Sequence, residues 1–186
     1  SLEDSIALTA NYRVINGITN LALGQDFNDQ NVDDIKKTGE KLLELAPNVR
    51  LIQDDNTQNA LLNGEASVAF LYTSQVTAAL AENPDLKVVY PEEGLGFGIM
   101  GMFIPSEAPD KDAAYSFMDY IMQPEVAAKC TDYIGYYSTN KAADELVNPD
   151  LVVPDDVTKG EIVQNVSQDA DAQYQKNWTE FKAACD

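Results

Sequence analysis

Histidine is missing from this 186-residue sequence, and lysine and arginine are scarce. Without histidine, Ser-His and Cys-His nucleophile pairs and His-ligated metal sites are excluded. Twelve Lys and Arg residues stand against 31 Asp and Glu residues, which gives a formal net charge of −19. Such a charge repels the phosphates of nucleic acids and anionic lipid headgroups, so nucleic acid is not an expected partner. The charge is compatible with cationic or neutral ligands, but acidity also promotes solubility outside the cell and names no substrate.

Long apolar runs and cysteines are also scarce. No window approaches the roughly 18 consecutive apolar residues of a membrane span, and the first residues do not read as a secretion signal. We therefore expect membrane attachment only through an anchor or a permease outside this sequence. Cys130 and Cys185 are too few for a disulfide scaffold and lack the spacing of a zinc site, so no metal and no cofactor is expected.

What the sequence does contain is an alternation of strand and helix patterns. Strand patterns cover residues 6–9, 49–52, 66–72 and 86–90. Between the first two, residues 31–47 predict a helix that Asn31 caps and Pro47 ends. This alternation predicts an α/β fold with a mostly parallel central sheet. The chain also starts abruptly at its first strand, as if an upstream portion were absent.

The second half of the sequence is mainly helical. "GFGIMGMFIP" (96–105) is apolar and rich in glycine, which is typical of a hinge or cleft wall. A helix with an apolar face follows, and the next begins at Pro124 and ends at Gly135. The last helix carries an apolar stripe of Tyr174, Trp178, Phe181 and Cys185.

Adjacent carboxylates such as Asp33-Asp34 and Asp54-Asp55 raise the question of acid-base catalysis. Glycosidases divide acid and base roles between two carboxylates. Neighbouring residues on a solvated turn rarely do so, and we therefore expect no enzyme.

Three segments together resemble the later part of bacterial spermidine/putrescine-binding proteins, the extracytoplasmic receptors of polyamine ABC importers. They are "LAPNVRLIQDDNTQNALLNGEASVAFLYTSQ", "VVYPEEGLGFGIMGMFIPSEAPDKDAAYSFMDYIMQPEVAAK" and "YIGYYSTNKAA". The resemblance implies a type II periplasmic-binding-protein-like α/β fold, with ligand in a cleft between two lobes that close by hinge motion. Residues 1–98 would form the second-lobe core, 99–146 would supply a hinge strand and helices that complete the first lobe, and 147–186 would return to the second lobe.

The resemblance also implies a ligand site with two aromatic residues. Tyr72 stands where the family places an aromatic ring against an aliphatic or cationic chain. Tyr136, after the helix-ending Gly135, would point its ring at the ligand, and Asn140 would cap the next helix. The alternative is that Tyr136 packs in the core.

Polar positions of the family site map onto three further residues. Asp54 occupies a cleft-loop position that is often a serine, and Gln164 matches a pocket glutamine. Asn11 stands where the family has a cleft aspartate at the end of the first strand.

Three residues leave the chemical class of the ligand undecided. The family places a tryptophan and a carboxylate in the hinge segment where this chain has Gly98 and Met100. An ammonium group that leaves water without a carboxylate partner is strongly disfavoured, which puts polyamine specificity in doubt unless Asp54 supplies the charge. Arg13 would suit an anionic ligand or form a structural tie.

The expected function is therefore a solute-binding receptor that delivers a small amine or polyamine-like ligand to an ABC permease. We expect a periplasmic or extracellular location, with lipoprotein anchoring or fusion to a permease left open. One alternative is an extracellular interaction module that kept the fold, and a weaker one is a carboxylate-dependent hydrolase. The helix with Phe117, Met118 and Ile121 is expected to expose an apolar face, and hence to favour a homodimer or segment exchange.

Overall fold

The computed structural model describes residues 2–151 and 160–185. The chain divides into two units. Unit 1 comprises Ser1–Gly98 and Asp155–Asp186, and unit 2 comprises Ile99–Pro154.

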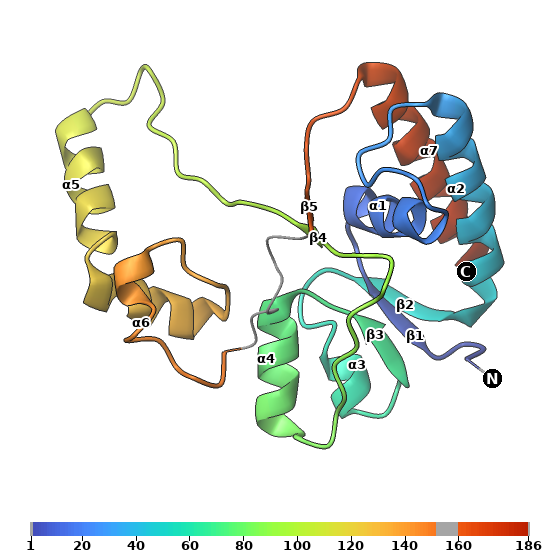
Figure 1. Cartoon of the computed structure of the whole chain (residues 1–186), viewed down its shortest axis with the longest axis horizontal. Coiled ribbons are helices and arrows are strands. Elements are labelled where there is room, and N and C mark those ends of the chain that lie inside the picture. The colour runs from blue at the N-terminus through green and yellow to red at the C-terminus, as the bar shows by residue number, and fades with distance from the viewer. Residues whose placement is uncertain (1, 152–159, 186) are drawn as a thin grey trace. The chain divides into compact units, whose positions relative to one another are not determined.

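Unit 1 is built on a three-stranded parallel sheet (Figure 1). Its central strand is β1 (Ile6–Thr9), with β2 (Val49–Gln53) on one side and β3 (Val68–Phe70) on the other. Ala7 of β1 lies opposite Leu51 of β2 and Ala69 of β3. The predicted α/β fold with a parallel sheet is confirmed.

Helices cover both faces of this sheet. Successive side chains of a strand point to opposite faces, and Leu8 and Ala7 accordingly enter different apolar clusters. Leu8 packs with α1 (Tyr12–Ala22), α2 (Val32–Leu45) and α7 (Gln168–Cys185), through Ile15, Leu42 and Phe181. Ala7 packs with Ala60 of the short helix α3 (Asn59–Leu62). In Figure 1, α2 and α7 run side by side, and the two helices are in contact.

The caps and the apolar stripe expected from the sequence are present. The Asn31 side chain accepts a hydrogen bond from the Asp33 N–H at 3.0 Å and begins α2. Pro47 lies in the 3-10 helix η1 (Ala46–Asn48) that follows. In α7, Tyr174 and Phe181 are fully buried.

Helix α1 was not predicted, because its buried face is partly polar. Ile15, Asn16, Gly17 and Asn20 line that face. Asn16 accepts a hydrogen bond from Asn177 at 3.1 Å, and Asn20 donates to the Tyr174 hydroxyl at 2.8 Å. These bonds compensate the burial of the amides, whereas asparagine and glycine within a segment disfavour the prediction of a helix.

Two strand predictions are wrong in whole or in part. Residues 86–90 form no strand, because no described strand pairs with them through backbone hydrogen bonds. Val89 of this segment is 82% exposed. The predicted strand 66–72 is reduced to β3, because Tyr72 already caps helix α4 (Thr73–Glu82).

The glycine-rich segment contains only a short strand. β4 (Gly96–Phe97) pairs in parallel with β5 (Glu161–Ile162), and residues 99–105 form no strand. The expected hinge strand therefore has no regular structure beyond Phe97.

Unit 2 consists of α5 (Lys111–Ile121), α6 (Pro124–Ile134) and the 3-10 helix η2 (Lys141–Ala143). Ala127, Ala128 and Ala143 form its small buried cluster. Helix α5 has no buried residue, and Phe117 is 60% exposed. The expected exposure of this apolar residue is confirmed, while Met118 and Ile121 are half-buried.

Among the described residues, no helix is both long and apolar enough to cross a membrane. Cys130 lies exposed in α6 of unit 2, and Cys185 ends α7 of unit 1.

Candidate functional site

Three of the predicted site residues follow the three strands of the sheet in unit 1. Asn11 comes two residues after β1, Asp54 directly after β2, and Tyr72 two residues after β3. Because the strands are parallel, their carboxyl ends lie at one edge of the sheet, which is where open α/β sheets bind ligands. The topology therefore brings these residues to a common edge.

Asn11 is held by two interactions at once. Its side-chain Oδ1 accepts from the backbone N–H groups of Arg13 at 3.1 Å and Val14 at 3.2 Å, which makes it the N-cap of α1. Its Nδ2 donates to the Tyr72 hydroxyl at 3.0 Å. One side chain thus starts a helix and fixes the neighbouring ring.

Gln75 joins Tyr72 to the loop that carries Asp54. Its Oε1 accepts from the Tyr72 N–H at 3.3 Å, and its Nε2 donates to the Asp54 carbonyl oxygen at 3.0 Å. The carboxylate of Asp54 stays exposed. Sequence reasoning missed Gln75, although a glutamine three residues after a helix cap is the capping-box spacing that could have found it.

Gln164 is held through its backbone. Its N–H donates to Asn28 Oδ1 at 2.9 Å, and its carbonyl oxygen accepts from Arg13 Nη2 at 3.2 Å. Arg13 Nη2 also donates to Asn28 Oδ1 at 3.1 Å, and the guanidinium lies 4.5 Å from the ring centroid of Tyr174. These contacts fit the structural-tie interpretation of Arg13, although its Nη1 is buried without an acceptor among the described residues. Asn28, the hub of the group, was not singled out from the sequence.

Gln164 also lines a cavity of about 510 Å³ in unit 1. Its other lining residues are Asp26, Asn28, Asp29, Gln30, Glu161 and Ile162. Asn11, Asp54 and Tyr72 do not line this cavity, but Arg13 connects the two groups, because its N–H donates to Asn11 and its guanidinium donates to Gln164.

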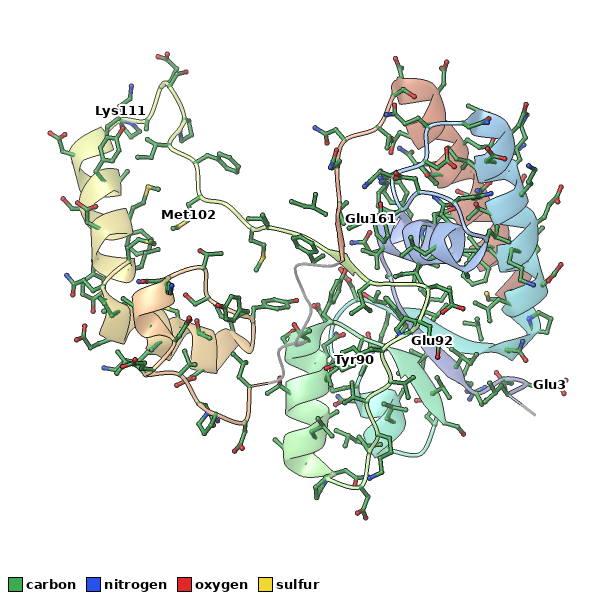
Figure 2. The ribbon with its side chains drawn as sticks, in the orientation of Figure 1. Glu3, Tyr90, Glu92, Met102, Lys111 and Glu161 are labelled. Atoms are coloured by element: carbon green, nitrogen blue, oxygen red, sulfur yellow. The ribbon has the colours of Figure 1, made fainter. Side chains whose placement is uncertain are left out.

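Glu161, which is labelled in Figure 2, lines this cavity, and its carboxyl group has a shifted pKa. Burial, followed by the neighbouring Asp26 carboxylate, raises the pKa of Glu161. A hydrogen bond that Glu161 Oε2 accepts from the Phe27 N–H at 3.1 Å opposes the rise.

Tyr136 belongs to unit 2. It follows Gly135, which ends α6 in the left-handed conformation with φ 79° as predicted. Tyr136 is half-buried, and Asn140 caps the short helix η2 by accepting from the Ala142 N–H at 3.1 Å. The expected position of Tyr136 beside the ligand stays a prediction.

Residues 7–165 match the family of bacterial extracellular solute-binding proteins. The chain belongs to this family. Among curated members, the spermidine/putrescine-binding periplasmic protein of Salmonella typhimurium is 30% identical over 188 residues, which cover 97% of this chain and 54% of the relative. A putrescine-binding periplasmic protein of Escherichia coli is 32% identical over 148 residues, which cover 73% of this chain and 40% of the relative.

Solved structures agree on the fold of this solute-binding protein. A structure described as a putative spermidine/putrescine ABC transporter from Listeria monocytogenes superposes with a TM-score of 0.83 at 26% identity, covering 97% of this chain and 58% of that one. A lipoprotein structure from Treponema pallidum gives a TM-score of 0.82 at 20% identity. The chain thus has the periplasmic-binding-protein fold, and it spans about half the length of the curated relatives it matches.

Proposed function

We propose that the protein containing this chain is the solute-binding component of an ABC importer and that it binds a small amine-bearing solute. The observation that carries the proposal is the meeting of Asn11, Asp54 and Tyr72 at the carboxyl edge of one parallel sheet, linked by the Asn11–Tyr72 and Gln75–Asp54 hydrogen bonds. Relatives named for binding spermidine and putrescine support the ligand class. The family description and those names, which are of binding proteins, support a non-enzymatic receptor outside the cytoplasmic membrane with a permease as partner.

Each residue has a proposed role. The ring of Tyr72 lies against the aliphatic or cationic chain of the ligand, an interaction worth roughly 0.5–2 kcal/mol. The carboxylate of Asp54 pairs with one amine. Tyr136 contributes a second ring and Gln164 a further polar contact. Gly98 and Met100 offer no charge, so spermidine is expected to bind less tightly than to a relative with a carboxylate there.

We further propose that unit 1 corresponds to the second lobe and that unit 2 completes the first lobe. The exposed side chains of α5 support this, because Tyr115, Phe117 and Tyr120 are each more than half exposed in a helix without a buried residue. Such a face fits a helix that packs against protein from the part of the relatives' length that this chain does not span. Self-association or segment exchange of the 186-residue chain stays a prediction, and sedimentation velocity across a dilution series would test it.

Calorimetry on the intact protein, with a panel of amines, amino acids and sugars, tests the function. A ligand at 100 times its dissociation constant should also raise the free energy of unfolding by about 2.7 kcal/mol. Asp54→Asn should lower the affinity for cationic ligands by about tenfold and leave the affinity for neutral ligands unchanged. Asp55→Asn is the matched control, because Asp55 is also exposed and lies in the same loop.

Replacing Tyr72 or Tyr136 by Ala should weaken binding by about tenfold. If Asp54→Asn and Tyr72→Ala bind the solute like the wild type, the site is wrong although the receptor function stands. If no amine in the panel binds, the proposed ligand class is wrong.

A further inference from the structure

The orientation of the Asn11 amide is fixed by the helix that it caps. Only the amide oxygen can accept the two N–H groups of Arg13 and Val14, at 3.1 and 3.2 Å, so the amide nitrogen must face Tyr72. The 3.0 Å bond between them therefore runs from Asn11 Nδ2 to the Tyr72 oxygen, and its direction cannot be reversed while the cap is made.

This direction decides what Tyr72 offers to a ligand. The Tyr72 oxygen is used as an acceptor by Asn11, and its own hydrogen has no acceptor among the residues that the structure describes. Tyr72 is half-buried at the edge of the sheet. The pair therefore presents an O–H donor, and an ammonium group, which has only donors, cannot accept from it.

We propose that the solute bears a hydrogen-bond acceptor, a carbonyl or hydroxyl oxygen, which receives the Tyr72 O–H, and a single ammonium group at its other end. This inference rests on the proposed receptor function and names the ligand class more narrowly. Beside Asn11 and Tyr72 we assign the ammonium group to Asp54, because Asn11 is neutral and the carboxylates Asp26, Asp29 and Glu161 line the separate cavity at Gln164. An acylated or hydroxylated amine has both the acceptor oxygen and the single ammonium group. A free diamine has an ammonium group for Asp54 but no acceptor oxygen for Tyr72.

Two ligands of equal carbon chain separate these cases by calorimetry on the intact protein. Putrescine carries two ammonium groups, and N-acetylputrescine carries one ammonium group and one amide carbonyl. Wild type should bind N-acetylputrescine more tightly. Tyr72→Phe keeps the ring but removes the donor, so it should lower the affinity for N-acetylputrescine by about three- to tenfold and change that for putrescine by less than about twofold.

Asn11→Asp should reverse the direction of the hydrogen bond to Tyr72 while position 11 still caps α1. Aspartate caps helices as well as asparagine does, and its carboxylate would accept the Tyr72 O–H in place of donating to it. The variant should therefore prefer putrescine, with a gain of about tenfold from the added charge. Thermal unfolding of both variants checks that they fold, and Tyr72→Phe stands alone as a test should Asn11→Asp not fold.

The outcomes separate the two proposals. Wild-type preference for putrescine, or variants that change both affinities by the same factor, would overturn this inference and leave the receptor function in place. Binding of neither ligand nor any other amine would overturn both.

Discussion

Gly96 of β4 lies against the ring of Phe27, which is fully buried, and the consequence of adding one methyl group there can be worked out. A Cβ at Gly96 would collide with Cε2 and Cζ of this ring. The same ring also lies against Gly17 of α1, where an added Cβ would be 2.5 to 2.7 Å from three ring atoms. Two glycines thus make room for the buried Phe27 ring.

Gly96→Ala should therefore overpack this contact. Inserting a methyl group into a well-packed site costs about 1–3 kcal/mol, while restricting the unfolded chain returns about 0.4–1 kcal/mol. We expect a net loss of about 1–2 kcal/mol in the free energy of unfolding. Gly98→Ala is the control, because nothing lies within 4 Å of its added Cβ and its change should stay within about 0.5 kcal/mol.

Urea unfolding followed by fluorescence measures this difference. Trp178 is the only tryptophan and packs on the core of unit 1 in α7, with its ring centroid 5.8 Å from that of Phe181, so its emission reports on unit 1. Phe27→Leu should partly rescue Gly96→Ala, so that the double variant is more stable than the sum of the single effects allows. Equal stability of the Gly96 and Gly98 variants, or strict additivity with Phe27→Leu, would refute the steric argument.

Two further predictions concern unit 1. Because burial and the charge of Asp26 raise the pKa of Glu161, the folded state binds this proton more tightly than the unfolded chain, and stability falls as pH rises through the raised pKa. Glu161→Gln still offers an acceptor to the Phe27 N–H but cannot titrate. When the free energy of unfolding is measured with urea across pH, this variant should lose the decrease that the wild type shows near the raised pKa. An unchanged slope would contradict the assignment to Glu161. Gly39→Ala should destabilise by about 1–3 kcal/mol despite its better helix propensity, because the new Cβ would lie 2.5 Å from the buried Oδ1 of Asn177. Thermal unfolding of this variant at or above the wild-type midpoint would contradict the expected clash.

What could be predicted from the sequence were features determined by neighbouring residues. The cap at Asn31, the helix end at Gly135 and the stripe of α7 each depend on a few positions along one segment, and all three are present. The parallel sheet followed from the alternation of strands and helices. Its carboxyl ends then brought Asn11 and Tyr72, 61 residues apart, within hydrogen-bonding distance.

What could not be predicted depends on distant partners. Residues 86–90 have the composition of a strand, but a strand needs a neighbour that local sequence does not reveal. From the sequence, Asn16 and Asn20 of α1 are expected on the surface. They are buried because they form hydrogen bonds with Asn177 and Tyr174, more than 150 residues away. The bonds of Asn28 likewise depend on a distant segment, because its Nδ2 donates to the Ile162 carbonyl oxygen of β5 at 2.9 Å. Local sequence around Asn28 does not indicate this partner.

Position 11 links the proposed site to the start of a helix. The residue there must accept the first N–H groups of α1, and Asn, Asp, Ser and Thr are the types that do so well. Among these only Asp carries a charge, and only Asn can donate to Tyr72 through its second side-chain atom while capping with the first. Exchange between Asn and Asp therefore reverses the hydrogen bond to Tyr72 and changes the charge at the sheet edge, while α1 keeps its cap. If thermal unfolding shows that both forms fold, a difference in ligand preference between them belongs to the site itself.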